Sequence, residues 1–243
     1  MLWSKLYLIH RAVNFLQCSL GTTAAPMLFF ETPLAFAGQT DSLTQPNERK
    51  MIMSKIKGTQ TEKNLLKAFA GESQARNRYT FFSAKASEEG YEHIAHIFLE
   101  TAEQEKVHAL QFFKYLDGGG ALEMTASYPA GSILTTEKNL EEAAAGELEE
   151  WSILYPEFAN IAKEEGFIDV AKTFNAISVS EKQHEKRYRA FLEHVKAGDL
   201  FKREGVVWRC RRCGFISSTP SAPGVCPACR MPQAWFEILA ENW

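Results

Sequence analysis

One four-residue unit occurs twice in the chain and limits its fold more than any other feature. The two copies are EKVH at residues 105–108 and EKQH at residues 181–184, each inside a long stretch with helical apolar spacing. Residues three apart lie on the same face of a helix, so each copy presents a carboxylate and an imidazole side by side. A single Glu-x-x-His is a weak signal, because most such matches are solvated helix surface.

The sequence around the two copies repeats as well. The run AGE that ends at Glu72 returns ending at Glu147, and the run EEG that ends at Gly90 returns ending at Gly166. The first pair is offset by 75 residues and the second by 76, which is also the offset between the two Glu-x-x-His units. The chain is therefore predicted to contain a duplicated helical hairpin, with a difference of one residue between the copies.

Counting along the hairpins places the candidate ligands at one level. If Gly90 and Gly166 end the first helix of each hairpin, seven side chains lie about 25 Å from the turns at 1.5 Å rise per residue. Two antiparallel hairpins packed face to face would bring them together at the centre of a four-helix bundle. The seven side chains are those of Glu72, Glu105, His108, Glu147, Glu150, Glu181 and His184.

Five carboxylates and two imidazoles at one buried level require a compensating charge. Unpaired buried charges are strongly penalised, whereas two iron ions would supply about four to six positive charges. A carboxylate-bridged two-metal site in a bundle uses one Glu from each of two helices and a Glu-x-x-His from each of the others. In this pattern Glu72 and Glu147 are the single carboxylates, and Glu150 is an additional one.

The helical spacing predicts where the four helices begin and end. Thr59 or Thr61 is expected to cap the first helix, and Pro156 to kink or break the third. A connection of about 18 residues after Asp117 is long enough to span a bundle, and a long second connection between short ones is the ferritin-like topology. The helices are expected at about residues 61–88, 91–116, 137–165 and 168–197.

Two tyrosines follow the single carboxylates by two helical turns. Tyr79 and Tyr155 lie on the same faces as Glu72 and Glu147, so core packing is the default interpretation. A phenol that is hydrogen-bonded to a ligand carboxylate is the alternative. Three further histidines do not repeat between the hairpins and are expected to be surface or otherwise satisfied residues. They are His93, His96 and His194.

Residues 1–52 differ from the remainder. The run AFAG at 35–38 has the small-x-small form of a signal-peptidase site, but Arg11, Asn14 and Gln17 interrupt the apolar stretch before it, which is too broken to span a bilayer. An upstream extension from a misplaced start codon is expected, which implies a cytoplasmic protein; a weak export signal within residues 1–37, which implies a periplasmic one, is the alternative. The net charge of -3 indicates no nucleic-acid or membrane partner.

Four cysteines near the C-terminus form two Cys-x-x-Cys pairs with 12 residues between them. Two such pairs make a tetrahedral four-thiolate metal site, and four sulfurs at one point do not suit disulfides. Zinc and iron both accept four thiolates. Neighbouring Trp208, Trp235 and Phe236 form an aromatic surround that is typical of an iron site kept dry for electron transfer. The cysteines are Cys210, Cys213, Cys226 and Cys229.

From about Met53 to Trp243 the chain resembles the rubrerythrins, which join a ferritin-like diiron domain to a rubredoxin-like domain. The motifs that carry the resemblance are AFAGESQARNRY at 68–79, EQEKVH at 103–108, AAGELEEW at 144–151, EKQHEKR at 181–187 and the two cysteine pairs. The resemblance implies a mostly α fold with a small four-cysteine iron domain at its end. The expected parts are an N-terminal extension at 1–52, the diiron domain at 53–198, a linker at 199–205 and the rubredoxin-like domain at 206–243.

The resemblance also implies a role for each ligand. Glu105 and Glu181 would bridge two irons, Glu72 and Glu147 would be terminal ligands, and His184 would bind the second iron. His108 and Glu150 would exchange as ligands of the first iron when its oxidation state changes. The chain departs from the family pattern at Trp151, where Tyr is frequent, and at Arg230, where free-standing rubredoxins usually have Gly.

The implied activity is reduction of hydrogen peroxide to water, with the four-cysteine iron relaying electrons to the diiron site. A separate NAD(P)H-dependent rubredoxin reductase or a small redox protein would donate them, because no nucleotide-binding glycine loop is present. His184 lies about 21 Å of helix before Gly198, so a head-to-tail homodimer would shorten the electron path. A ferroxidase or iron-storage protein and a four-cysteine zinc-ribbon adaptor are the alternatives.

Overall fold

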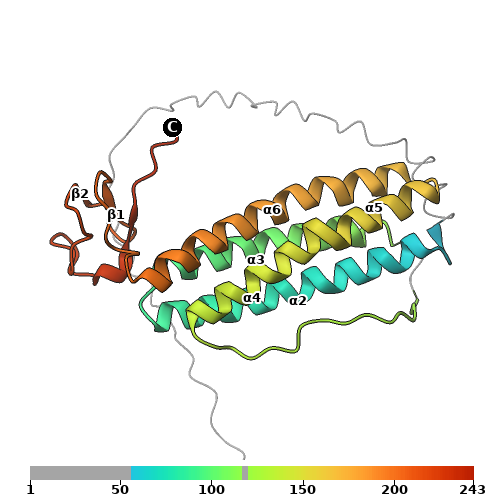
Figure 1. The fold of residues 1–243 in the computed structure, drawn as a ribbon, viewed down its shortest axis with the longest axis horizontal. Coiled ribbons are helices and arrows are strands. Elements are labelled where there is room, and N and C mark those ends of the chain that lie inside the picture. Colours follow the sequence, from blue (N-terminus) through green and yellow to red (C-terminus); the bar gives the residue numbers. More distant parts are fainter. Residues whose placement is uncertain (1–55, 117–119) are drawn as a thin grey trace, which may run out of the picture. The chain divides into compact units, whose positions relative to one another are not determined.

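The computed structural model describes residues 56–116 and 120–243, and the N-terminal extension expected at 1–52 lies outside them. The described chain is mostly helical, as expected, and a small three-stranded sheet follows the helices (Figure 1). None of the described helices has an apolar stretch long enough to cross a membrane. The helices are α2 (Gln60–Glu88), α3 (Glu92–Phe113), α4 (Thr136–Glu149), the π-helix η1 (Glu150–Leu154), α5 (Tyr155–Glu164) and α6 (Ile168–Ala197).

The helix ends follow local sequence signals. The Thr59 hydroxyl accepts a hydrogen bond from the Glu62 backbone N–H, which caps α2 as predicted. Gly90 and Gly166 take φ values of 83° and 87° at the two short turns, a conformation that favours glycine. The prediction that the second helix reaches Leu116 is wrong, because α3 ends at Phe113 and the next residues form a tighter turn.

The third helix, in which Pro156 was expected to cause a kink or a break, is divided just before that proline into α4, η1 and α5. In η1 the Tyr155 N–H reaches back to the Glu150 carbonyl, five residues away, and Pro156 stands at the start of α5. A π-turn inserts one residue into an α-helix. The repeat offset is 75 at Glu147 and 76 at Tyr155, so this turn accounts for the one-residue difference between the hairpins.

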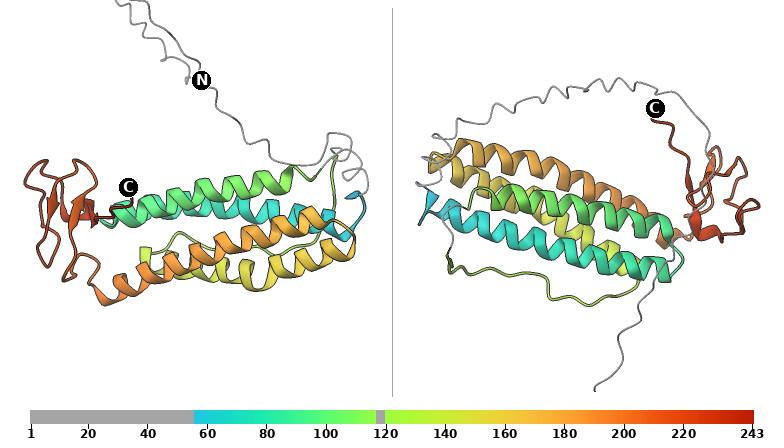
Figure 2. Two further views of the ribbon diagram at one scale, coloured as in Figure 1. Left: turned by 90° about the horizontal axis from the view of Figure 1, so that it is seen from above. Right: turned by 180° about the vertical axis from the view of Figure 1, so that it is seen from behind.

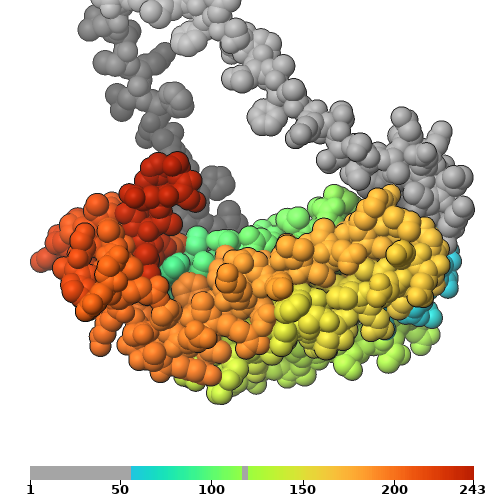
Figure 3. Space-filling view, turned by 45° about the horizontal axis from the view of Figure 1, so that its top comes forward, coloured from blue at the N-terminus to red at the C-terminus, as the bar shows by residue number. Residues whose placement is uncertain are grey.

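The helices pack in two pairs, α2 with α3 and α6 with α4 and α5 (Figure 2). Figure 3 shows the second pair from outside, with α6 against α5. Two apolar cores fill the space between the pairs. One core contains Tyr79, Phe98 and Tyr188, and the other contains Phe112, Tyr155 and Phe174. Each core therefore contains one of the two tyrosines, Tyr79 and Tyr155, that follow the single carboxylates in the sequence.

The connection between α3 and α4 runs alongside α2 (Figures 1 and 2). Two hydrogen bonds attach its described part to that helix: the Tyr128 hydroxyl donates to the Lys67 carbonyl at 2.9 Å, and the Gln74 amide donates to the Pro129 carbonyl at 3.0 Å. This segment is called the long connection below and comprises residues 120–135. Its course is that expected of a connection that spans the bundle.

The C-terminal part is an antiparallel sheet in the order β2-β1-β3. Trp208, Phe236 and Ala222 surround Cys210 and Cys226 in its core. The segment expected to be a linker at 199–205 is tied to this part, because Lys202 forms a bridge with Ser221 and Phe201 packs against the core. The strands are β1 (Trp208–Cys210), β2 (Ile216–Ser217) and β3 (Phe236–Ile238).

Candidate metal centres

In the bundle, six of the seven predicted side chains meet in two overlapping groups. The ligand atoms of each group lie within 4.8 Å of one another, and among the described residues none of His93, His96 and His194 belongs to either group. A carboxylate common to two groups is positioned to bridge two ions. The first group is Glu72, Glu105, His108 and Glu181; the second is Glu105, Glu147, Glu181 and His184.

The groups are buried but their polar atoms are not satisfied by the protein. All four glutamates of the two groups are 0% exposed, and oxygens on each of them lack a hydrogen-bond partner. His184 Nδ1 lies 2.8 Å from Glu181 Oε2 and 3.1 Å from Glu105 Oε1 without forming an aligned hydrogen bond to either. Buried polar atoms that face a common point without partners suit metal ligands.

Each core tyrosine holds one carboxylate of the opposite hairpin. Tyr79 donates to Glu147 Oε1 at 2.6 Å, and Tyr155 donates to Glu72 Oε1 at 2.5 Å. Burial, followed by the charges of nearby glutamates, raises the pKa of both phenols well above their ordinary value, so both remain donors at neutral pH. The hydrogen-bonded alternative is therefore confirmed, with the two pairs crossed between hairpins.

Gln104 is a residue of this site that the sequence pattern did not identify. Its side-chain oxygen accepts a hydrogen bond from His184 Nε2 at 2.9 Å, which leaves Nδ1 of the same ring directed at the carboxylates. Such a partner fixes the tautomer and the orientation of a ligand histidine. The position 76 residues later is Ser180, so the repeat gives no signal for Gln104.

Glu150 is the one predicted ligand that the structure places in neither group. It is half-buried at the start of η1, and its Oε1 lies 3.8 Å from the point that a Cβ atom would occupy at Gly71. Burial, followed by the charge of Glu147, raises its pKa well above the ordinary value. The adjacent Trp151 donates to Glu185 and also lies outside the ligand groups.

Protons balance the buried charge when metal is absent. Burial, followed by the charge of Glu105, raises the pKa of Glu147 to about 8. Burial alone would raise the pKa of Glu105, but the hydrogen bond from His108 and the adjacent His184 imidazole lower it to about 2. Burial would lower the pKa of both histidines, but Glu105 and Glu181 raise that of His108 to about 9. Glu105, Glu147 and Glu181 raise the pKa of His184 to about 12. Cations would replace these protons, so the site fits metal ions whose binding releases protons.

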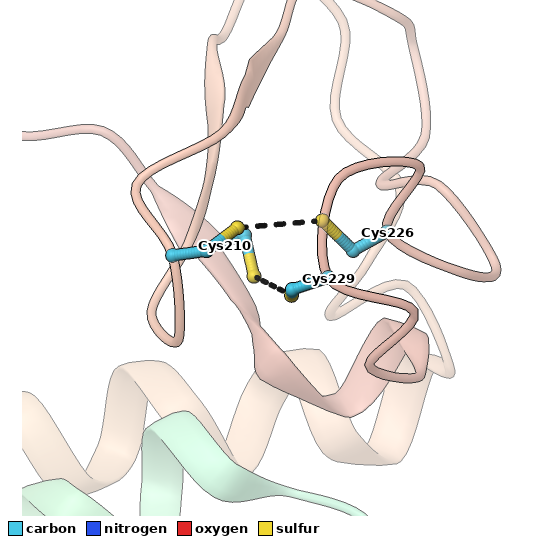
Figure 4. A group of neighbouring side chains, drawn as sticks. Cys210, Cys226 and Cys229 are labelled. Carbon is cyan, nitrogen blue, oxygen red and sulfur yellow. Dashed lines mark hydrogen bonds between the residues drawn. The ribbon is translucent and has the colours of Figure 1, made fainter.

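The four cysteines meet at the second site, where the sulfurs of Cys210, Cys226 and Cys229 face one another (Figure 4). The Cys210 and Cys229 sulfurs are 3.7 Å apart, as are those of Cys213 and Cys226, and none of the four forms a disulfide. Sulfurs about 2.3 Å from a tetrahedral ion are about 3.8 Å apart, so the spacing suits one four-thiolate ion.

Both cysteine pairs are followed by a residue with positive φ. Gly214 has φ 78° and donates to the Cys210 carbonyl, and Arg230 has φ 64° and donates to the Cys226 carbonyl. A left-handed conformation costs a side-chain-bearing residue about 1–2 kcal/mol. This conformation explains why glycine suits the position after each cysteine pair. Arg230, which follows the second pair, adopts the same geometry at that cost.

Comparison with known proteins identifies the same two parts. The rubrerythrin family model matches residues 63–192, and the model described as "Rubrerythrin, rubredoxin-like domain" matches residues 208–237. Rubrerythrin of Porphyromonas gingivalis is 56% identical over 81% of this chain and 98% of its own length. Rubrerythrin of Nitratidesulfovibrio vulgaris is 50% identical over 79% of this chain and 100% of its own length.

Solved structures agree with the fold. The structure titled "Fully reduced state of nigerythrin (all ferrous)" has a TM-score of 0.52 and is 31% identical over 83% of this chain and 91% of its own. The two parts, their order and the chemistry of both ligand sets match the same family and its iron cofactors. This chain belongs to the rubrerythrin family and combines a ferritin-like diiron bundle with a rubredoxin-like iron domain.

Proposed function

We propose that this protein is a non-haem diiron peroxidase that reduces hydrogen peroxide to water and protects against oxidative stress. The observation that carries the proposal is the pair of overlapping ligand groups that share Glu105 and Glu181, present in one chain with a four-thiolate site. Two irons supply one electron each when bound, and the cysteine iron returns electrons singly. The reaction balances as one peroxide, two electrons and two protons giving two waters.

Each candidate ligand would have its own role in metal binding. Glu105 and Glu181 would hold both metal ions, and Glu72 and Glu147 would each bind one ion through the oxygen that its tyrosine leaves free. His108 would occupy the ligand position that Glu150 takes over after a change of oxidation state. In support, His108 lies inside its group and Glu150 lies outside, in a π-turn that has an additional residue.

Electrons would come from a separate NAD(P)H-dependent rubredoxin reductase or a small redox protein, and would reach the bundle through Cys210, Cys213, Cys226 and Cys229. A head-to-tail homodimer would place the cysteine site of one chain beside the bundle of its partner. We further propose that the protein acts in the cytoplasm, with the periplasm as the alternative if residues 1–37 direct export.

The proposal is tested by metal content and colour. We expect two iron ions in the bundle and one at the cysteines, and a red ferric-thiolate absorbance that a reductant bleaches and peroxide restores. Metal analysis and visible spectra of the purified full chain measure both. Zinc alone at the cysteines would contradict electron relay, and rapid oxidation by dioxygen with retention of ferric mineral would favour iron storage instead.

Removal of the N-terminal extension is expected to have no effect on either centre. A chain that begins at Met53 keeps every candidate ligand, so it should bind the same metals and reduce peroxide at the same rate. Metal analysis and steady-state kinetics beside the full chain make the comparison. Loss of iron or of activity would contradict this, and a natural form cleaved after Ala37 would support export.

A further inference from the structure

A pocket of about 350 Å³ lies beside the bundle site, between α2, the η1–α5 segment and the long connection. Glu150 and Tyr155 line it, and Tyr155 donates to the buried Glu72. Tyr128 of the long connection also lines it and is attached to α2 through the Lys67 carbonyl. The pocket thus extends from the long connection to side chains that contact the candidate ligands.

This pocket is larger than hydrogen peroxide requires. One water molecule takes about 30 Å³ of liquid volume, and a peroxide has only two heavy atoms. A volume of about 350 Å³ is instead typical of sites that hold small organic molecules against apolar walls with a few polar groups. Ala68, Leu154 and Phe158 provide apolar surface. Two of the polar groups, the hydroxyls of Tyr79 and Tyr155, donate to candidate ligands. Charged side chains also line the pocket, namely those of Lys67, Arg78, Glu149, Glu150 and Glu157.

Gly71 keeps the space between Tyr128 and Glu150 free. A Cβ atom at this position would lie 3.8 Å from Tyr128 Cε1 and 3.8 Å from Glu150 Oε1. An alanine would therefore fit at ordinary contact distance, whereas a leucine would fill the passage.

We propose that this pocket receives small organic hydroperoxides as a second class of substrate. The apolar group would lie against Leu154 and Phe158, and the –OOH group would face Glu150. The inference rests on the proposed peroxidase function and uses the same two electrons. The O–O bond breaks, and one hydroperoxide with two electrons and two protons gives one alcohol and one water.

The test compares cumene hydroperoxide with hydrogen peroxide on the iron-loaded full chain and on the Gly71→Leu variant. We expect the unaltered protein to reduce both substrates. In Gly71→Leu, the ratio of kcat/KM for cumene hydroperoxide to kcat/KM for hydrogen peroxide should fall about 10-fold or more, because only the larger substrate needs the filled space. Gly71→Ala should resemble the unaltered protein, and Ala145→Leu, which adds the same side chain at an exposed position of α4, should change neither value.

Binding of the product alcohol provides a readout that does not depend on turnover. Calorimetric titration of 2-phenyl-2-propanol into the oxidised full chain should give saturable heat in the unaltered protein and in Ala145→Leu, and none in Gly71→Leu. Helical circular dichroism checks that the variants fold. If Gly71→Leu does not fold, the titration of the unaltered protein still decides, because absence of saturable heat there would overturn the proposal.

The outcomes separate the two proposals. Reduction of hydrogen peroxide without reduction of cumene hydroperoxide, or alcohol binding that Gly71→Leu leaves unchanged, would overturn the second substrate class alone. Failure to reduce either substrate would overturn the peroxidase function, and the inference with it.

Discussion

Replacement of both Cys210 and Cys213 by alanine is expected to reduce NAD(P)H-driven peroxide reduction to the background rate. Two of the four thiolates are lost, so the cysteine site cannot hold its ion, and under the proposed relay the bundle would receive no electrons. A bundle that has been reduced chemically should still be oxidised by peroxide at the original rate in stopped-flow measurements. Cys18→Ala is the matched control and should keep full activity, because Cys18 belongs to neither Cys-x-x-Cys pair.

Mixing this variant with a second one tests how electrons travel. The second variant carries Glu105→Ala and Glu181→Ala, which removes the two carboxylates common to both ligand groups. If transfer runs between the chains of a head-to-tail dimer, mixed dimers should recover NAD(P)H-driven activity. A mixture that exchanges subunits and remains inactive would place the transfer within one chain, and continued activity of the cysteine variant alone would exclude the relay.

Glu150→Ala is expected to leave iron bound but to slow peroxide turnover about 10- to 100-fold. Both ligand groups remain complete without Glu150, so iron content should not change. Turnover should fall because the carboxylate that we propose replaces His108 after oxidation is missing. Metal analysis and stopped-flow oxidation by peroxide measure the two effects separately.

Glu164→Ala provides the matched control for this substitution. Glu164 is exposed at the end of α5, so Glu164→Ala makes the same side-chain change without altering the surroundings of the ligands. Equal turnover in the two variants would show that Glu150 acts only as surface charge. Loss of iron from Glu150→Ala would show instead that it is a permanent ligand.

Much of this site follows from local sequence rules. Spacing by three residues puts Glu105 beside His108 and Glu181 beside His184 within a single helix, whatever the remainder of the chain does. Thr59 caps the start of α2, and Gly90 and Gly166 form the turns that end the first helix of each hairpin, through interactions of adjacent residues. The cysteine pairs likewise form within tight turns. Such features depend on neighbours in sequence, and the duplication then indicates that the two hairpins are equivalent.

The tertiary structure determined what depends on distances between helices. The crossed bonds from Tyr79 to Glu147 and from Tyr155 to Glu72 join opposite hairpins, and Gln104 reaches His184 from another helix. The sequence contained the one-residue difference between the hairpins, but only the folded chain places it as a π-turn at Glu150. Neither apolar periodicity nor repeat offsets encode which side chains meet across a bundle, because that depends on the rotation and axial position of each helix against its neighbours.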